Sequence, residues 1–223
     1  MNYPVTTIYA DVRVALDQNQ SESQLVAIDY TLEFDDLVAQ KLLHAARQIL
    51  EMVPAVMIDN GKDMRKQEFA RGDVEIGDGL YYYTLKLPTD YLRLLSLKLS
   101  SWDTTLRSTV EDDSEAAQMA RSEFLGITGN PSRPIAIDDY PNKAERRLII
   151  YSGDKNETLD RAVYCQEPAI VNGMLNFPVG LYNTLVYRTA ALVTGTYGNT
   201  TQMQTLLAMS GQAPANNNEG GEQ

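Results

Sequence analysis

The sequence predicts an α+β protein in which a helical bundle built from both chain ends carries an antiparallel β-rich insertion. Apolar residues recur at helical spacing over residues 37–53, alternate with period two between Leu80 and Trp102, and return to helical spacing over residues 181–193. The predicted division is 1–56 and 168–210 for the helical bundle, 57–167 for a β-rich insertion containing one helix, and 211–223 for a disordered tail.

Two helices are expected before the insertion. The first covers about residues 6–18 and is followed by a polar linker. The second has Asp35 and Asp36 at its start, where the helix dipole favours acidic side chains, and Pro54 closes it. Its long apolar stripe predicts a core helix.

Two more helices are expected after the insertion. Pro178 is suited to the first turn of a helix that runs to about Tyr197, and its apolar residues cover more than one face. Such a helix is expected to be buried on several sides. Gly198 ends it, and Asn199 or Thr200 caps a final helix.

The insertion is expected to contain strands on both sides of Pro88, with a turn or single helical turn between them. Residues 57–79 are polar and glycine-bearing, which predicts mostly loop. One helix is expected from Asp112 to about Leu125. Three further strands are expected at 135–138, 147–152 and 161–166.

Tyrosine is unusually frequent, with thirteen tyrosines against four phenylalanines. Tyr81, Tyr82 and Tyr83 put aromatic rings on both faces of one strand, so we expect something other than the domain's own core to cover one face. An ordinary edge strand with exposed tyrosines is the alternative.

The charge of the chain is −11, and its distribution is uneven. Residues 1–60 hold nine acids and three bases, whereas residues 169–218 hold only one charged side chain, Arg188. An acidic protein does not bind nucleic acid by neutralising phosphates over a broad face. The charge is consistent with simple solubility, or with a surface that stays close to DNA without binding it.

The sequence does not predict an enzyme, a cofactor site or a metal site. His44 and Cys165 are the single histidine and cysteine, so a closed zinc site built from such ligands is excluded. Phosphate-loop, dinucleotide, nucleophile-elbow and zinc-protease motifs are absent from the sequence. Asp138 and Asp139 leave a carboxylate-dependent hydrolase as one alternative, although neighbouring strand residues point to opposite faces.

Three segments resemble the head-to-tail adaptor proteins of short-tailed bacteriophages, of the tail tubular protein A type, and the ring proteins below the portal of crAss-like phages. They are Phe34–Leu50, which carries a core helix, Leu87–Trp102, which begins with an LPxDYL-like turn, and Asn176–Ala190, which opens a closing helix near a proline. The resemblance covers the layout of most of residues 30–210.

The resemblance implies a structural virion protein of the tail or neck, made in the host bacterial cytoplasm. Such a protein forms a homo-oligomeric ring, a dodecamer, that binds the portal protein and further tail proteins and leaves a channel for genomic DNA without binding it specifically. No membrane, cofactor or catalytic residue is implied. Alternatives are another tail ring or tail-completion protein, or a non-viral soluble interaction adaptor.

Candidate contact residues follow from the tyrosine bias and from the low charge of the C-terminal helices. Those expected at partner or oligomer interfaces are Tyr81, Tyr83, Trp102, Tyr187, Met203, Leu206 and Leu207.

Overall fold

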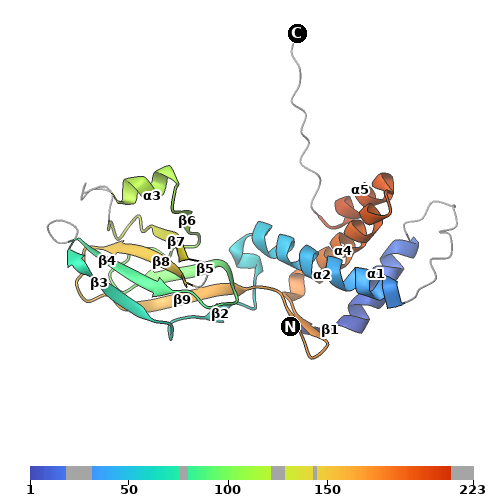
Figure 1. The fold of residues 1–223 in the computed structure, drawn as a ribbon, viewed down its shortest axis with the longest axis horizontal. Helices are drawn as coiled ribbons and strands as arrows, with labels where there is room; N and C mark the ends of the chain where they lie inside the picture. Colours follow the sequence, from blue (N-terminus) through green and yellow to red (C-terminus); the bar gives the residue numbers. More distant parts are fainter. Residues whose placement is uncertain (19–31, 76–79, 122–128, 143–144, 212–223) are drawn as a thin grey trace, which may run out of the picture. The chain divides into compact units, whose positions relative to one another are not determined.

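The computed structural model describes residues 1–18, 32–75, 80–121, 129–142 and 145–211 (Figure 1). Within these residues the chain is α+β, with 5 helices and about 11 strands in three sheets, 39% helical and 30% strand. It divides into two compact units, one formed by Met1–Asn60 and Pro168–Gln223 and the other by Gly61–Glu167. The chain therefore crosses between the units twice.

The first unit combines helices with a small sheet. Its helices are α1 (Val5–Gln18), α2 (Leu32–Met52), α4 (Tyr182–Thr196) and α5 (Thr200–Met209), with the short 3₁₀ turns η1 (Ala55–Met57) and η2 (Val179–Leu181). Its strands are β1 (Asn2–Pro4), β10 (Ile170–Val171) and β11 (Met174–Asn176), in the order β1-β11-β10.

Helix α4 is the centre of the first unit, because it packs against α1, α2 and α5. This explains why its apolar residues cover more than one face. Two threonines are buried in it, and each hydroxyl donates to the backbone carbonyl one turn earlier, Thr189 to Leu185 and Thr194 to Ala190. The backbone of the helix itself thereby satisfies these two buried hydroxyls.

The β10–β11 hairpin was missed in the sequence. Its turn is Asn172-Gly173, and both residues have positive φ angles, 52° and 71°. Positive φ at both central positions defines the turn type that suits a two-residue hairpin, and Asn-Gly is its preferred sequence. Strand β1 then pairs with β11, with Tyr3 opposite Leu175.

The second unit is mainly β-structure. Its elements are β2 (Lys62–Asp63), β3 (Phe69–Glu75), β4 (Tyr81–Lys86), β5 (Tyr91–Leu99), β6 (Val110–Glu111), α3 (Glu115–Ala120), β7 (Ala136–Asn142), β8 (Glu145–Ser152) and β9 (Leu159–Gln166). They form a sheet of order β2-β9-β5 and a second sheet of order β3-β4-β8-β7-β6.

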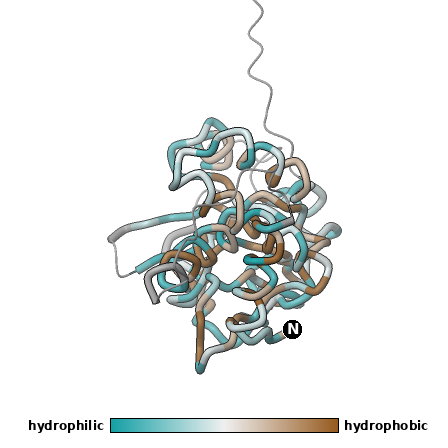
Figure 2. The backbone as a smooth tube through the Cα atoms, turned by 90° about the vertical axis from the view of Figure 1, so that its right-hand side faces the viewer, coloured by the Kyte–Doolittle hydropathy of each residue, from teal (hydrophilic) through white to brown (hydrophobic). Residues whose placement is uncertain are grey.

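The two sheets of the second unit share one hydrophobic core. Leu97 and Ala162 come from the three-stranded sheet, and Tyr83, Leu85 and Ile150 come from the five-stranded sheet. Figure 2 colours the backbone by hydropathy and shows hydrophobic stretches interspersed with hydrophilic ones. Inward-facing residues of both sheets thus account for the period-two pattern.

A second, smaller cluster lies on the other face of the five-stranded sheet. Ala117 and Ala120 of α3 pack there with Leu80 and Tyr151, and Tyr82 packs against this cluster. The expectation that something other than the unit's own core covers one face of the Tyr81–Tyr83 strand is therefore wrong. The same unit covers both faces, and β4 is an inner strand between β3 and β8.

The predicted architecture, a helical bundle built from both chain ends with an antiparallel insertion, is also wrong. The unit that holds both chain ends contains a three-stranded sheet, in which β1 pairs with β11 from the other end of the sequence. The insertion is not purely antiparallel, because β6 and β7 run parallel. These strands have two to seven residues, and most are too short to produce a clear alternation in the sequence.

Other element predictions differ at their ends. Strand β3 occupies part of the predicted loop 57–79. Helix α3 begins at Glu115, with the hydroxyl of Ser114 accepting from the backbone N–H of Ala117, and its predicted end at Leu125 lies outside the described residues. So do most of the predicted linker and residues 212–223 of the predicted tail. Asn199 caps α5 as expected.

A buried carboxylate joins three parts of the second unit. Glu157, 7% exposed, accepts hydrogen bonds from the hydroxyls of Ser100, Ser101 and Ser152 and from the backbone N–H of Ser101. Hydroxyl and amide donors stabilise a buried charge by several hydrogen bonds. Glu157 therefore ties the β8–β9 connection to the end of β5.

Replacing Glu157 by glutamine (Glu157→Gln) should destabilise the protein by about 2 kcal/mol, because one charged acceptor oxygen becomes a donor facing hydroxyls. Urea unfolding measures the change. Glu68→Gln, at an exposed position of the same unit, should change stability by less than about 0.5 kcal/mol. Equal stability of both variants would contradict the arrangement around Glu157.

Gly72 on β3 lies under the ring of Tyr82. A Cβ atom at position 72 would come within 1.8 Å of the Tyr82 ring, so Gly72→Ala must displace the ring from the cluster below α3. We expect a loss of about 1–3 kcal/mol in the free energy of unfolding. Gly180→Ala is the control, since a Cβ there meets no atom within 4 Å. A Tyr82→Ala background should remove most of the cost of Gly72→Ala, and an unchanged cost would contradict this explanation.

Candidate functional site

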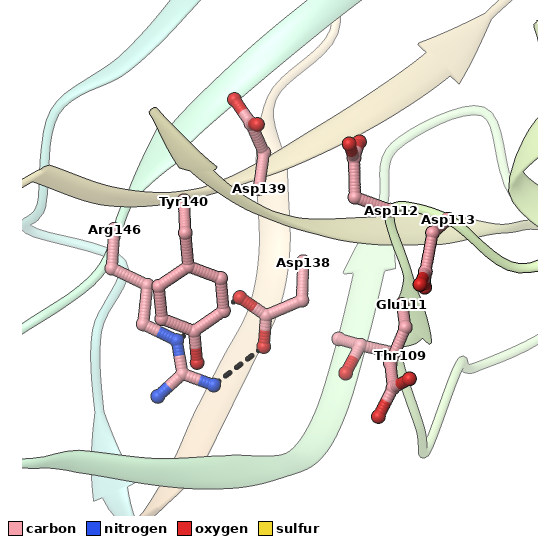
Figure 3. Close-up of a pocket in the computed structure, with 8 residues that line it drawn as sticks. All are labelled: Thr109, Glu111, Asp112, Asp113, Asp138, Asp139, Tyr140 and Arg146. Carbon is pink, nitrogen blue, oxygen red and sulfur yellow. Dashed lines mark hydrogen bonds and ion pairs between the residues drawn. The ribbon is translucent and has the colours of Figure 1, made fainter. Parts of the chain in front are cut away.

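An open pocket of about 520 Å³ lies in the second unit, where β6, β7 and β8 meet (Figure 3). Five of its eight lining residues are acidic. The lining residues are Thr109, Glu111, Asp112, Asp113, Asp138, Asp139, Tyr140 and Arg146. This pocket holds both Asp138 and Asp139, either of which the hydrolase alternative would use.

Asp138 is neutralised within the pocket. Its two carboxylate oxygens accept from Nε and Nη2 of Arg146 at 3.0 and 2.6 Å, a two-pronged ion pair, and the residue is 8% exposed. The guanidinium of Arg146 also lies over two aromatic rings, 4.6 Å from the centroid of Tyr91 and 4.5 Å from that of Tyr140. The arrangement orients Arg146 from three sides.

The neighbouring acids are held separately. Asp139 accepts from Nε of Arg147 at 2.7 Å, and Asp112 pairs with Arg121. Asp139 and Arg147 face each other directly in the pairing of β7 with β8. The carboxylates of Asp138 and Asp139 point in different directions (Figure 3), as expected for adjacent strand residues.

The electrostatics of the pocket favour permanent charge over proton transfer. Burial opposes the charge of Arg146, but the hydrogen bonds and attraction of Asp138 outweigh it and raise the pKa of Arg146. Burial, followed by repulsion from Asp138, raises the pKa of Tyr91. A guanidinium that keeps its proton in this way does not act as a general acid near neutral pH. Among the described residues, no group of three or more histidine, cysteine or acidic side chains is placed to hold a metal ion.

His44 and Cys165 each have local contacts. His44 is exposed on α2, and its Nε2 lies 2.9 Å from Nε2 of Gln48. Cys165 is buried in β9, and burial raises the pKa of its thiol to about 11. A reactive catalytic thiol has a lowered pKa and access to solvent, so Cys165 is a structural residue.

The predicted contact residues divide into two groups. Tyr83, Trp102 and Leu206 are 3%, 2% and 0% exposed, so they belong to the chain's own core in this conformation. The others are half-buried and retain some surface. They are Tyr81, Tyr187, Met203 and Leu207.

Helix α5 shows which side chains of the low-charge C-terminal region reach the surface. Leu206 and Ser210 face inward, and a side chain at Gly195 of α4 would lie 2.8 Å from the sulfur of Met203. The outward-facing residues carry no charge. They are Thr201, Gln204, Thr205, Ala208 and Met209.

Four pocket residues were not predicted from the sequence. They are Thr109, Glu111, Tyr140 and Arg146. Tyr140 is 58% exposed and lies in β7, and Arg146 lies in β8, which pairs with β7. A turn was expected at Tyr140-Pro141, whereas β7 continues to Asn142, so the sequence did not place Arg146 beside the acidic strand.

Comparison with known proteins leaves the chain without an assigned family. No protein-family model matches it, and no curated protein matches it. Within the described residues, every helix is too short or too polar to cross a membrane.

Cys165 should resist thiol reagents while the protein is folded. With its pKa raised to about 11 by burial, little thiolate is present at pH 8, and the residue is only 2% exposed. Labelling with an aromatic disulfide at pH 8 should be slow in buffer and complete in urea. Rapid stoichiometric labelling of the folded chain would contradict a structural role.

Asp138→Asn should destabilise the protein by about 2–3 kcal/mol, because Arg146 would remain partly buried without its carboxylate. Chemical unfolding provides the measurement. Asp113→Asn, in the same pocket but exposed, is the matched control and should shift stability by less than about 0.5 kcal/mol. If the two variants have the same free energy of unfolding, the ion pair between Asp138 and Arg146 does not stabilise the protein.

Proposed function

We propose that the chain is a non-enzymatic structural protein of a bacteriophage virion, a head-to-tail adaptor that forms a ring between the portal and the tail. Its partners are further copies of itself, the portal protein and other tail proteins. Genomic DNA passes through the centre of the ring without specific binding.

The location of the three resembling segments carries the proposal. Phe34–Leu50 lies within α2, Leu87–Trp102 contains the turn into β5 and this strand, and Asn176–Ala190 leads from β11 into α4. They build the frame of both units: the long α2, the nine-residue β5 and the central α4. The likeness therefore concerns framework elements of the fold.

The chemistry of the pocket supports a structural role. Its buried acid, Asp138, is paired with Arg146, and the neighbouring Asp139 is paired with Arg147. These pairs stabilise the sheet and orient Tyr140 at the surface. An acidic chain also suits a wall along which DNA passes, because a cationic wall would retain the phosphates.

The outward face of α5 is the surface we assign to the portal. The exposed residues of this face carry no charge, so a partner can cover them without burying an unpaired charge. Removal of the whole segment 200–223 is not a clean test, because Leu206 is completely buried and its loss would expose α4.

Assembly of the purified chain tests the proposal. Native mass spectrometry over a range of concentrations, alone and with the portal protein of the same phage, should show a discrete ring near dodecameric size or its complex with the portal. A chain that stays monomeric under both conditions would contradict the adaptor role. Binding to tail proteins but never to the portal would indicate a ring further down the tail.

Charged substitutions on α5 test the assigned surface. Gln204→Glu with Ala208→Glu should weaken portal binding by about tenfold or more, because two negative charges would enter a desolvated contact. Glu145 and Glu68 line an already charged surface of the second unit, so Thr84→Glu there is the control. Equal portal affinity of all variants would show that α5 is not part of the portal contact.

A further inference from the structure

Asp90 contacts three residues in the second unit, all close to the points where the chain enters or leaves it. It lies in the turn between β4 and β5. One carboxylate oxygen accepts from Nζ of Lys62 at 3.1 Å and the other accepts from the hydroxyl of Tyr164 at 2.8 Å. Its backbone carbonyl accepts from the N–H of Glu167 at 2.7 Å.

These contacts involve both connecting segments. Lys62 lies in β2, immediately after the first crossing at Asn60–Gly61, and Glu167 is the last residue before the second crossing at Pro168. Tyr164 is paired with Lys62 across β2 and β9. A single turn residue thus joins the incoming strand, the outgoing strand and the residue that ends the unit.

The side-chain contacts of Asp90 are charge-assisted. Burial alone would raise the pKa of Asp90, but the hydrogen bonds from Tyr164 and Lys62 and the charge of Lys62 lower it below its ordinary value. Burial and the hydrogen bond to Asp90 raise the pKa of Tyr164. The contacts therefore favour an ionised Asp90 and a neutral Tyr164.

The first connecting segment is also held by packing. A Cβ at Gly61 would come within 2.7 Å of side-chain atoms of Leu95 and of Val163, so the backbone lies directly against β5 and β9. In the second segment, the ring of Pro168 restricts one backbone dihedral.

We propose that Asp90 is a positioning residue that anchors both connecting segments to the second unit, holding Lys62 and Glu167 in place where the chain enters and leaves it. This inference goes beyond the proposed function and does not depend on it. It gives the LPxDYL-like turn a mechanical role, because the turn fixes the two ends of the second unit to each other.

Hydrogen exchange of the full chain tests the anchor. Asp90→Ala should speed amide exchange over residues 61–64 and 165–167 by about tenfold, roughly the effect of one charge-assisted hydrogen bond on local opening. Asp90→Asn keeps an acceptor for Tyr164 but loses the charge, so its effect should be smaller. Asp160→Asn, an exposed aspartate on β9, is the control and should leave both segments unchanged.

Two exchange results would overturn the inference. One is unchanged exchange of both segments in Asp90→Ala while β4 and β8 stay protected. The other is an equal acceleration throughout the second unit in Asp90→Asn as well as Asp90→Ala, which would make Asp90 a general stability residue.

Discussion

The packing of α4 is the constraint on which the first unit depends. The residues before Asn60 and those after Pro168 are separate in the sequence, and α4 joins them by packing on α1 and α2. A helix in this position must be apolar or neutral around much of its circumference. Much of the low charge of the C-terminal region therefore reflects the burial of α4. Helix α5 is less buried, so partner contacts are needed to explain only its share of the low charge.

The five-stranded sheet has the corresponding role in the second unit. Because β4 contributes to the core between the sheets and to the cluster under α3, Tyr83 is buried by internal packing, and Tyr81 and Tyr82 keep only part of their surface. The charged side chain of Arg146 is also held within this unit, between a carboxylate and two aromatic rings. Tyr140 and the outward-facing residues of α5 are more exposed than the tyrosines of β4.

The sequence predicted the long elements well and the short ones poorly. The apolar stripe of α2 and the alternation around β5 each extend over several turns or residue pairs, so chance matches are few. Strands of two or three residues have no such pattern, and the Asn172-Gly173 turn was the one local signal for them. Trp102 was expected at an interface between chains, and it is buried within its own chain. Alternation along a strand indicates that one face is covered but not which chain covers it. The pairing of Arg146 with Asp138 depends on strand register, which the sequence does not supply.

The pairing of β2 with β9 brings the two ends of the second unit together, with Asp63 opposite Val163. A folded insert whose ends are adjacent costs its host no more loop-closure entropy than a short surface loop. The first unit therefore has to close only a narrow gap between Asn60 and Pro168, however large the insert. Inserts of quite different size could occupy this place in the chain at nearly the same conformational cost, provided that a strand pair of this kind closes them.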